Sequence, residues 1–344
     1  GFGTSNGAVI NTGLELQQNW YSDVAISKDG LVIAVQQVPN DGSFGNPSSD
    51  TVIKAYSLQN NSIVQIGDDM SAVSAYPSNP GEIKLNNDGS KLLLFNHNQL
   101  VEYSFVNGAW ENISYDIISE GNMTTGEIDE DFNTIITNSG RIYEKINNSW
   151  ELELNIGFGN YADNRSSNIS DDGDKVVIST YTGGGQNGSI GGFKVYHKFN
   201  GSWLQIGADV LGSNIYAFLG DEITISNDGL TVFASSNANE AGLEREIKVF
   251  NYDGSDWVLS AQLPCKDWVT DLKYHSDGIN QYLGVFSSQQ SSTYFSMGPE
   301  ILVFKLNGEN WTMVSSSEDL VDPILRYRTA IGNNRIVMIT REYC

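Results

Sequence analysis

Carboxylates are the most numerous side chains in this 344-residue chain that could carry out acid–base chemistry. There are 42 Asp and Glu against 19 Lys and Arg, which gives a formal net charge of -23 at pH 7. Glycosidases and lyases use carboxylates in pairs, but nothing in the spacing pairs any two of them, and in so acidic a chain a solvated carboxylate is the commoner case. Carbohydrate-active catalysis is therefore an alternative, and we do not expect an enzyme. The best-placed carboxylates for catalysis are Asp23, Glu127, Asp221, Glu222 and Asp271.

The three histidines do not form a recognisable catalytic or metal-binding set. His97 follows one strand, His197 lies on another and His275 precedes a turn, so their positions in the repeat described below all differ. No nucleophile elbow, zinc-protease helix motif or phosphate loop is present. The Asp-rich segment 170–174 suits calcium, but one turn supplies only about two or three of the roughly six to eight oxygens that calcium needs. We therefore expect no metal site. Calcium is the one cofactor that this segment suggests, but the sequence does not supply a full set of ligands for it.

Aromatic residues form a second group of candidates, because they precede short predicted strands and have Asn and Asp neighbours. Such a setting suits stacking on sugars and hydrogen bonding to them. The alternative is that these rings pack between repeat units. The candidates for ligand binding are Trp20, Tyr21, Tyr76, Tyr161, Tyr216, Phe218 and Trp268.

Nine Asn-x-Ser/Thr sequons could accept glycans in a secreted protein. Three of them, at Asn60, Asn147 and Asn200, fall in predicted hairpin turns where a glycan would fit. The full set is Asn60, Asn112, Asn122, Asn147, Asn164, Asn168, Asn187, Asn200 and Asn310.

The elements that would position all these side chains are short strands joined by repeated turns. A turn of the type Ser/Asn-x-Asp-Gly occurs five times, and weaker versions stand at 131–132 and 332–333. An Asp-Gly pair between apolar runs is a strong hairpin signal, because Gly adopts the positive φ that the turn requires. The five pairs are Asp29-Gly30, Asp88-Gly89, Asp172-Gly173, Asp228-Gly229 and Asp277-Gly278.

A second hairpin follows the first in each unit. It joins a strand that ends in Tyr or Phe to a strand that begins, seven residues later, on Trp or Ile, with an Asn-Asn, Asn-Gly or Asp-Gly pair between them. The six pairs are Tyr56 and Ile63, Tyr103 and Trp110, Tyr143 and Trp150, Tyr196 and Trp203, Phe250 and Trp257, and Phe304 and Trp311. Each unit therefore has four strands, here called a, b, c and d, and the recurring rings are expected to pack between units.

Units of about 40 to 60 residues with four antiparallel strands predict an all-β fold, a β-propeller. Strands a and b occur seven times, whereas complete c–d pairs occur six times, because the last unit breaks off after Tyr343. The segment SNGAV at 5–9 resembles VNGAW at 106–110 and could supply the missing strand d. We predict one seven-bladed domain over 1–344, with 1–16 as the closing strand of blade 7. The predicted blades are 17–70, 71–120, 121–156, 157–211, 212–263, 264–320 and, for the rest of blade 7, 321–344.

The segment SWLQIGADVLGSNIYAFLGDEITISNDGLTVFASS at 202–236 resembles the Ser-x-Asp-Gly and FG-GAP-like propeller repeats of secreted and surface proteins. It is similar more distantly to WD40-like and TolB-like repeats. The resemblance covers nearly the whole chain and implies the propeller architecture, but not an activity, because such repeats serve binding, scaffolding and a few enzymes. The DxDxDG calcium loop of integrin-type FG-GAP repeats is absent from this sequence.

The cysteines, Cys265 and Cys344, are too few for a disulfide scaffold. Cys265 is predicted in the d–a connection between blades 5 and 6, and Cys344 in strand c of blade 7, heading for the opposite face. A disulfide needs Cα atoms within about 7 Å, so we expect no bond between them.

The predicted connections suggest which face binds a partner. The b–c and d–a connections emerge on one face of a propeller, and the predicted b–c loops are long at 37–50, 181–189, 237–245 and 288–299. Variable loops on a rigid scaffold commonly carry function. We expect a secreted or surface-exposed, non-catalytic module that binds glycan or protein through this face. An alternative is a subunit of an extracellular fibre that donates 1–16 to a neighbouring copy.

The composition also limits the partners and the location. The negative charge repels nucleic acids and anionic membrane surfaces, and no segment approaches the roughly 18 apolar residues of a membrane helix. We therefore expect no nucleic-acid partner and no membrane insertion. The extracellular expectation is based on the resemblance, the acidic surface and the Gly at position 1, where an unprocessed chain would have Met.

Overall fold

The fold consists of β-strands joined by turns. The computed structural model describes residues 23–37, 51–59, 62–71, 81–96, 99–117, 125–156, 166–180, 190–214, 217–237, 245–265, 268–288, 299–317, 327–332 and 335–340. Within these ranges, no helix has the length and apolar character needed to cross a membrane.

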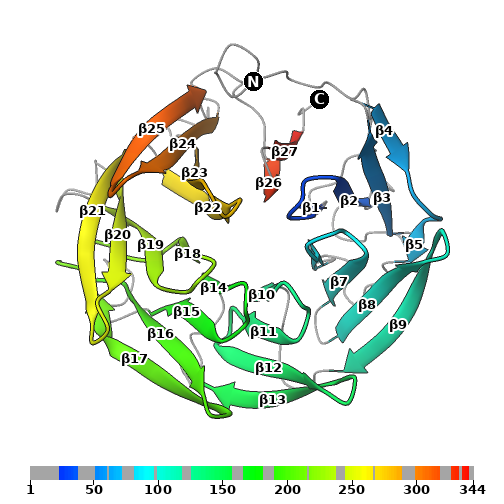
Figure 1. Ribbon diagram of the computed structural model, residues 1–344, viewed down its shortest axis with the longest axis horizontal. Coiled ribbons are helices and arrows are strands. Elements are labelled where there is room, and N and C mark those ends of the chain that lie inside the picture. Colours follow the sequence, from blue (N-terminus) through cyan, green and yellow to red (C-terminus); the bar gives the residue numbers. More distant parts are fainter. Residues whose placement is uncertain are drawn as a thin grey trace, which may run out of the picture. The chain divides into compact units, whose positions relative to one another are not determined.

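Successive strands pair antiparallel with their neighbours in the chain, so that each blade is one sheet of consecutive strands (Figure 1). Blade 1 contains β1 (Val24–Ile26), β2 (Val32–Gln37), β3 (Val52–Gln59) and β4 (Ser62–Gln65), with β5 (Met70–Ser71) also paired to β3. Blade 2 contains β6 (Glu82–Leu85), β7 (Lys91–Asn96), β8 (Gln99–Val106) and β9 (Ala109–Ile117). Blade 3 contains β10 (Gly126–Ile128), β11 (Thr134–Thr137), β12 (Arg141–Ile146) and β13 (Ser149–Asn155).

The later blades repeat this order. Blade 4 contains β14 (Ser167–Ile169), β15 (Lys175–Ser179), β16 (Gly192–Phe199) and β17 (Ser202–Leu211). Blade 5 contains β18 (Ile223–Ile225), β19 (Thr231–Asn237), β20 (Arg245–Tyr252) and β21 (Trp257–Cys265). Blade 6 contains β22 (Trp268–Ser276), β23 (Gln281–Ser288), β24 (Pro299–Asn307) and β25 (Asn310–Ser317). A last sheet contains only β26 (Tyr327–Gly332) and β27 (Arg335–Thr340).

These sheets confirm the all-β prediction and its four-stranded antiparallel blades, in a β-propeller. The described residues form six such blades and one two-stranded sheet, so the predicted count of seven complete blades is not reached. β26 and β27 correspond to strands a and b of the predicted blade 7. The predicted closing strand at 1–16, and Tyr343, lie outside the described residues.

The chain divides into two compact units. The first holds β1 to β9 together with β26 and β27, and in it β1 contacts both β6 and β26. The second holds β14 to β25 and most of the β10–β13 sheet, and in it β18 contacts both β14 and β22. The first strands of successive blades are therefore neighbours within each unit.

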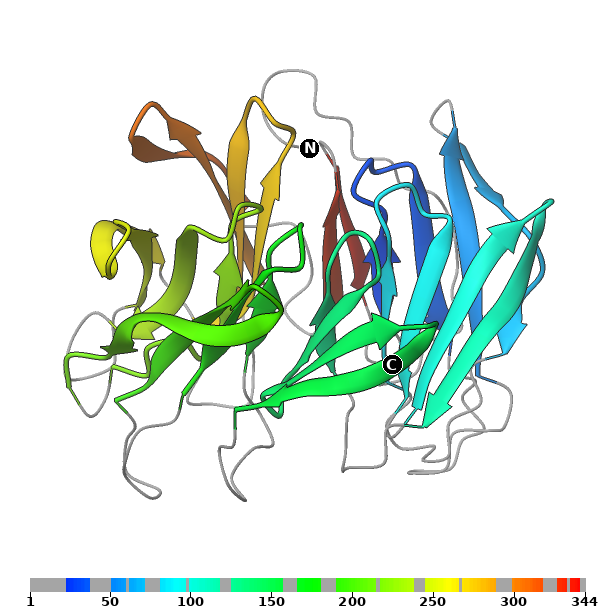
Figure 2. The same cartoon turned by 60° about the horizontal axis from the view of Figure 1, so that its bottom comes forward.

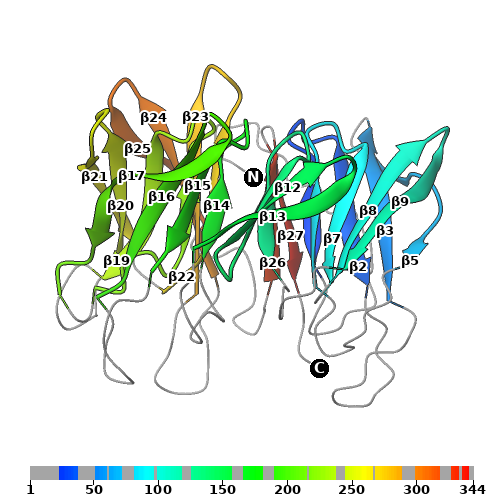
Figure 3. The same cartoon turned by 90° about the horizontal axis from the view of Figure 1, so that it is seen from below.

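In blades 2 to 5, each strand of the second hairpin is longer than the first strand of the blade. β14 and β18 have three residues each, whereas β16 has eight and β17 has ten. The long β8–β9 hairpin is seen in cyan to green in Figure 2, and β16 and β17 are labelled in Figure 3. These four blades therefore widen away from their first strands, whereas in blade 6 the first strand, β22, has nine residues, as many as β24.

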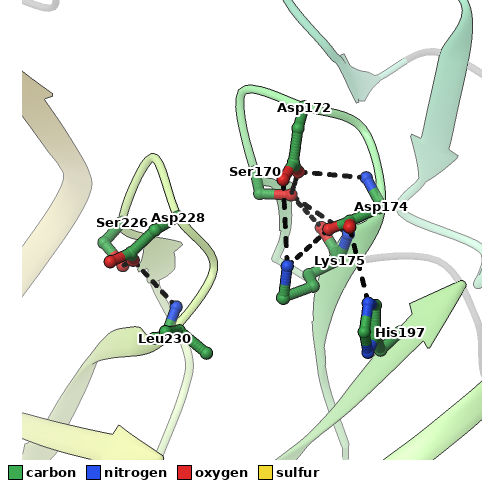
Figure 4. Close-up of polar contacts among 8 residues, drawn as sticks. All are labelled: Ser170, Asp172, Asp174, Lys175, His197, Ser226, Asp228 and Leu230. Carbon is green, nitrogen blue, oxygen red and sulfur yellow. Dashed lines mark hydrogen bonds and ion pairs between the residues drawn. The ribbon is translucent and has the colours of Figure 1, made fainter.

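The Ser-x-Asp-Gly turns join strands a and b through a fixed set of hydrogen bonds. Ser226 Oγ donates to Asp228 Oδ1 at 2.6 Å and accepts the N–H of Thr231 at 2.9 Å. Asp228 Oδ1 also accepts the N–H of Leu230 at 3.0 Å, and Gly229 completes the turn with φ of 68°. Ser170 and Asp172 repeat the Ser–Asp contact at 2.6 Å in blade 4, and Figure 4 shows both turns.

These turns also join neighbouring blades. In the second unit, Glu130 N–H donates to the carbonyl of Asp171 at 3.2 Å, and Asp171 N–H donates to the carbonyl of Asn227 at 3.0 Å. Gly173 packs so closely against Asp129 that a Cβ there would lie 2.7 Å from its Oδ2 atom. The glycine therefore provides both the positive φ and the space for the adjacent blade.

The periodic Trp residues pack between blades, as expected. Trp110 Nε1 donates to the carbonyl of Ile66 in blade 1, and Trp257 Nε1 donates to that of Ile206 in blade 4, both at 3.1 Å. Trp311 meets Phe233 of blade 5 edge to face, with ring centroids 5.2 Å apart. These rings are part of the interfaces between blades rather than of a ligand site.

Candidate functional site

Strand ends of blades 5 and 6 that lead into the b–c and d–a connections lie at one end of the sheets, here called the loop end of the second unit. Asp221 precedes β18, Ser235 and Ser236 are near the end of β19, Arg245 begins β20 and Trp268 begins β22. Consecutive strands run antiparallel, so the beginnings of the a and c strands and the ends of the b and d strands lie at the same end of a sheet. The chain order therefore places these residues at the same end of their sheets, and the packing of the blades brings them into one group.

A small pocket lies at this loop end, with an empty volume of about 220 Å³ that includes its opening to solvent. It combines two aromatic rings with a cation, a carboxylate and two hydroxyls. The lining residues are Phe218, Asp221, Ser235, Ser236, Arg245, Trp268 and Val269.

The aromatic side of the pocket is a packed pair rather than two open rings. The Phe218 and Trp268 rings are tilted by 59°, with centroids 6.5 Å apart. The Arg245 guanidinium carbon lies 4.0 Å from the centroid of the Trp268 ring, so one face of the indole is occupied by a cation–π contact. The planar guanidinium is thereby held in one orientation at the pocket wall.

The backbone before Asp221 is held by blade 4. Leu219 forms a parallel bridge with Gly191, its N–H donates to the carbonyl of Ile190 at 3.2 Å, and its carbonyl accepts the N–H of Gly192 at 2.7 Å. Phe218 has a φ of 46°, a value that is uncommon for a bulky residue. Surrounding contacts are needed to hold such a residue, and the bridge at Leu219 provides them.

Burial and charge act against each other on the two ionisable groups of the pocket. Burial raises the pKa of Asp221 to about 6, and the nearby Arg245 charge limits this rise. Burial lowers the pKa of Arg245, and the charge of Asp221 opposes that shift. Asp221 therefore changes protonation in mildly acidic solution, whereas an Asp exposed to water does so near pH 4.

A second ionic cluster lies beside the pocket and contains three of the predicted carboxylates. Lys273 Nζ lies 3.3 Å from Asp271 Oδ1 and 3.9 Å from Glu127 Oε1. Burial raises the pKa of Glu222 well above its usual range, the Asp271 charge raises it further, and Lys273 opposes both. Asp23 is separate from this cluster: it lies in the first unit, where its Oδ2 atom accepts the N–H of Ile83 at 2.9 Å.

The structure places two of the seven aromatic candidates, Phe218 and Trp268, together in the pocket. The other five fall outside the described residues: Trp20, Tyr21, Tyr76, Tyr161 and Tyr216. Sequence reasoning missed Arg245, Ser235 and Ser236. The available signal was an arginine at the end of a long b–c loop in a chain with few cations.

The histidines and cysteines are widely separated along the described chain. His197 Nε2 lies 3.4 Å from Asp174 Oδ2 in blade 4, as Figure 4 shows, whereas His275 is buried in blade 6. Cys265 is buried at the end of β21. His97 and Cys344 lie outside the described residues, so the expected absence of a disulfide is not tested.

The Asp-rich turn at 170–174 uses its carboxylates within the protein. Partial burial favours a higher pKa for Asp172, but hydrogen bonds from Ser170 Oγ and the Asp174 N–H, together with the Lys175 charge, outweigh it and lower that pKa. Lys175 Nζ lies 2.5 Å from Asp174 Oδ1. Among the residues whose positions are described, no group of three or more His, Cys, Asp or Glu is arranged to hold a metal ion.

The sequons differ in accessibility. Asn112, Asn147, Asn200 and Asn310 are exposed on outer strands or their turns. Asn168 is half-buried, and its Oδ1 atom accepts the N–H of Ile225 at 3.4 Å. The remaining sequons lie outside the described residues: Asn60, Asn122, Asn164 and Asn187.

Comparison with known proteins supports the fold. A scan against protein-family models and a search of curated proteins both found no match. Among solved structures, the chain is similar to a Bacteroides uniformis protein proposed to be a 6-phosphogluconolactonase, with 14% identity, a TM-score of 0.56 and coverage of 92% of this chain and 88% of that one. It is also similar to the periplasmic gluconolactonase of Pseudomonas aeruginosa, with 13% identity, a TM-score of 0.54 and coverage of 88% and 86%.

A third similar structure is the hydrazine synthase of Kuenenia stuttgartiensis, with 12% identity, a TM-score of 0.52 and coverage of 86% of this chain and 84% of that one. At such identities the likeness extends to the fold alone, and these proteins differ in function. The propeller architecture implied by the sequence resemblance is confirmed, and the type of repeat stays a prediction.

Proposed function

We propose that this protein is a non-catalytic binding module that recognises a glycan through the loop end of its blades. The observation that carries this proposal is the pocket at Phe218, Trp268, Arg245 and Asp221, which combines apolar ring surface with a fixed donor and a fixed acceptor. Sugar rings present both an apolar face and hydroxyl groups, so they need both kinds of contact.

The pocket does not enclose a ligand. Its volume of about 220 Å³ includes open solvent, and the enclosed part has room for about one water molecule. A sugar would therefore lie against the surface that these residues form, and the affinity of this surface alone would be weak.

The experiment that tests this proposal is a glycan array on the purified protein, followed by calorimetry with the best ligand. Trp268→Ala removes the ring that supports Arg245, and we expect it to weaken binding at least about tenfold. Phe199→Ala is the matched control, because Phe199 is an exposed aromatic (59%) away from the pocket. If the wild type and Trp268→Ala bind with equal affinity and have equal melting temperatures, the ligand does not bind at this pocket.

A carbohydrate-active enzyme is the second candidate, and the ionic cluster favours it specifically. Glu222, whose pKa is raised, lies near the charges of Asp271 and Lys273, and a protonated acid beside an ionised carboxylate is the arrangement that glycosidases use. A turnover assay with each glycan that binds, using wild type and Glu222→Gln, separates the two functions. Binding without cleavage supports the module, and cleavage that Glu222→Gln abolishes supports the enzyme.

We also propose that β26 and β27 belong to a seventh blade that residues 1–16 complete, in a secreted or surface-exposed protein. The matching segments at 5–9 and 106–110 support this closure. Donation of 1–16 to another copy, giving a fibre, is the alternative. Size measurement with and without 1–16 distinguishes them, since a full-length monomer contradicts donation. Peptide mass spectrometry after secretory expression tests glycans at Asn147 and Asn200.

A further inference from the structure

The two kinds of hairpin turn differ in how they hold the backbone nitrogen of their glycine. In the a–b turns this N–H donates back into the turn, as that of Gly229 does to the carbonyl of Ser226 at 2.8 Å. In the c–d turns after β8 and β16, the N–H groups of Gly108 and Gly201 donate to no group in the described part of the chain. These two nitrogens are therefore open to solvent and to the residue before them.

That preceding residue is an asparagine with an open side chain in both c–d turns. Asn107 and Asn200 are exposed at the hairpin tips, with φ of 52° and 50°, and neither amide forms a hydrogen bond with a residue that the structure describes. A Cβ placed on Gly108 or Gly201 would meet no atom within 4 Å. Each tip therefore has room for the main chain to rearrange and for water to approach.

The third Asn-Gly pair within the described residues, Asn307-Gly308, is held differently. Asn307 ends β24 and is itself paired with Asn310 across the hairpin, whereas the other two asparagines lie between the paired strand ends. Its Nδ2 atom also donates to Thr312 Oγ1 at 2.5 Å. The same two residue types therefore occur once with a bound amide and twice with an open one.

We propose that Asn107 and Asn200 are sites of spontaneous deamidation, at which the side-chain amide becomes a carboxylate through a cyclic imide. The nitrogen of the following glycine attacks Cγ of the asparagine, and the amide group leaves as ammonia with the proton from that nitrogen. Glycine obstructs this attack least, because it has no Cβ. Water then opens the imide at one of its two carbonyls and gives aspartate or isoaspartate, so one water is consumed for each ammonia released.

The products change the hairpins in two ways. Each conversion adds a negative charge to a chain whose net charge is already -23. Isoaspartate also lengthens the main chain by one carbon at a turn whose left-handed backbone suits Asn and Gly, so the β8–β9 and β16–β17 hairpins should weaken with age. The inference goes beyond the proposed glycan binding and does not depend on it, because the c–d turns lie at the opposite end of each sheet from the b–c connections.

The test is peptide mass spectrometry of the full chain, produced without N-glycosylation because a glycan on Asn200 would block the leaving amine. The protein is kept at pH 8, and the rate of amide loss at each pair is divided by the rate in a free peptide of the same sequence. We expect this ratio to be roughly fivefold or more higher at Asn107 and Asn200 than at Asn307, the factor for one hydrogen bond that must break first.

Thr312→Val is the variant that tests the cause, since it removes the acceptor of the Asn307 amide at an exposed position. It should raise the ratio at Asn307 toward those of the other two pairs, and its melting temperature shows that it is folded. Equal ratios at the three pairs in the wild type, or the highest ratio at Asn307, overturn the inference. Amide loss in the peptides but not at Asn107 and Asn200 of the folded chain also overturns it, as does an unchanged ratio at Asn307 in the folded variant.

Discussion

Carboxylates at the two ends of the second unit have pKa values that are shifted in opposite directions. At the end where the short a–b and c–d turns lie, hydrogen bonds lower the pKa of Asp253, which accepts the N–H groups of Asp256 and Ser255. The same cause lowers the pKa of Asp277 to about 2, with Asn280 as the main donor. At the loop end, burial raises the pKa of Asp221 to about 6 and that of Glu222 well above its usual range.

The difference shows where the chain stabilises its charges locally and where it does not. A turn carboxylate is ionised and fixed by backbone N–H groups one to three residues away, so it contributes to the hairpin. The carboxylates of the loop end are removed from water without an equal set of donors, an arrangement typical of functional sites. Asp129 is the exception at the turn end: burial raises its pKa although it accepts the N–H groups of Asn133 and Thr134.

Of the substitutions that test this difference between the two ends, Gly191→Ala should have the largest effect on stability and binding. Gly191 has a φ of 69°, and a Cβ there would overlap the backbone nitrogen and oxygen of Leu219. We expect a loss of about 3 kcal/mol in the free energy of unfolding, from the strained φ and the displaced backbone. Ligand binding should also be lost, because Phe218 and Asp221 lie on either side of Leu219, the bridge partner of Gly191. Denaturant unfolding measures the loss.

Gly278→Ala is the matched control for that variant. Gly278 also has a positive φ, of 84°, but a Cβ there meets no atom within 4 Å. Only the conformational term of about 1 kcal/mol should be lost, with binding unchanged. Equal destabilisation by both variants would show that the Gly191–Leu219 bridge does not hold the loop end.

The next effect should be that of Ser226→Ala at the turn end. This change removes the acceptor for the Thr231 N–H and the donor to Asp228 from a buried position. We expect a loss of about 1–2 kcal/mol by thermal unfolding. Ser255→Ala, which removes an exposed hydroxyl contact to Asp253, should cost less than about 0.5 kcal/mol, and a reversed order would contradict the fixed-turn interpretation.

A smaller effect is expected in the pH dependence of stability. Because the folded pKa of Asp221 is above its ordinary value of 3.8, the native state binds the proton more tightly, and stability falls as pH rises from about 4 to about 6. Asp221→Asn should remove roughly 1–2 kcal/mol of this fall, after allowance for solvent screening. Urea midpoints between pH 4 and pH 7 measure it, and the other carboxylates whose pKa is raised, Glu222 and Asp129, contribute to the slope that remains. An unchanged slope in the variant would contradict the raised pKa.

The smallest effect should be that of Asp277→Asn. Asp277 is exposed, and its pKa is lowered to about 2, so its contribution is present above pH 4 and lost as pH falls toward 2. The variant should be slightly less stable than the wild type near pH 7, and this difference should shrink as pH falls toward 2. Thermal unfolding at both pH values checks this, and a difference that grows on acidification would contradict it.

The sequence was sufficient for the blades because their signals are local. The spacing of Tyr196 from Trp203 and of Phe250 from Trp257 predicted hairpins that the structure contains, and the Asp-Gly pairs marked the first hairpin of each blade. One turn was classified too broadly: in HSDG, Ser276 directly precedes Asp277, and Asp277 Oδ1 accepts the N–H groups of Ile279 and Asn280 instead of forming the Ser–Asp contact.

The candidate site was only partly predictable from the sequence. Phe218 and Trp268 could be listed, but their contact, and the position of Arg245 over the indole, depend on segments more than 20 residues apart that only the packed blades bring together. The cluster of Glu127, Asp271 and Lys273 has the same origin, since it joins blades 3 and 6. Charge and residue type were visible in the sequence, and pairing was not.

The contact between successive turns has a consequence for how such a chain can change during evolution. Glu130, Asp171 and Asn227 occupy the same place in three turns, and the neutral Asn227 can stand where the other two are acidic, because the contact uses only their N–H and carbonyl groups. A duplicated repeat would therefore carry both the N–H donor and the carbonyl acceptor that its turn needs to bind the two neighbouring turns, whatever its surface residues. The number of blades can change by gain or loss of whole units, while selection remains free to alter side chains at the loop end.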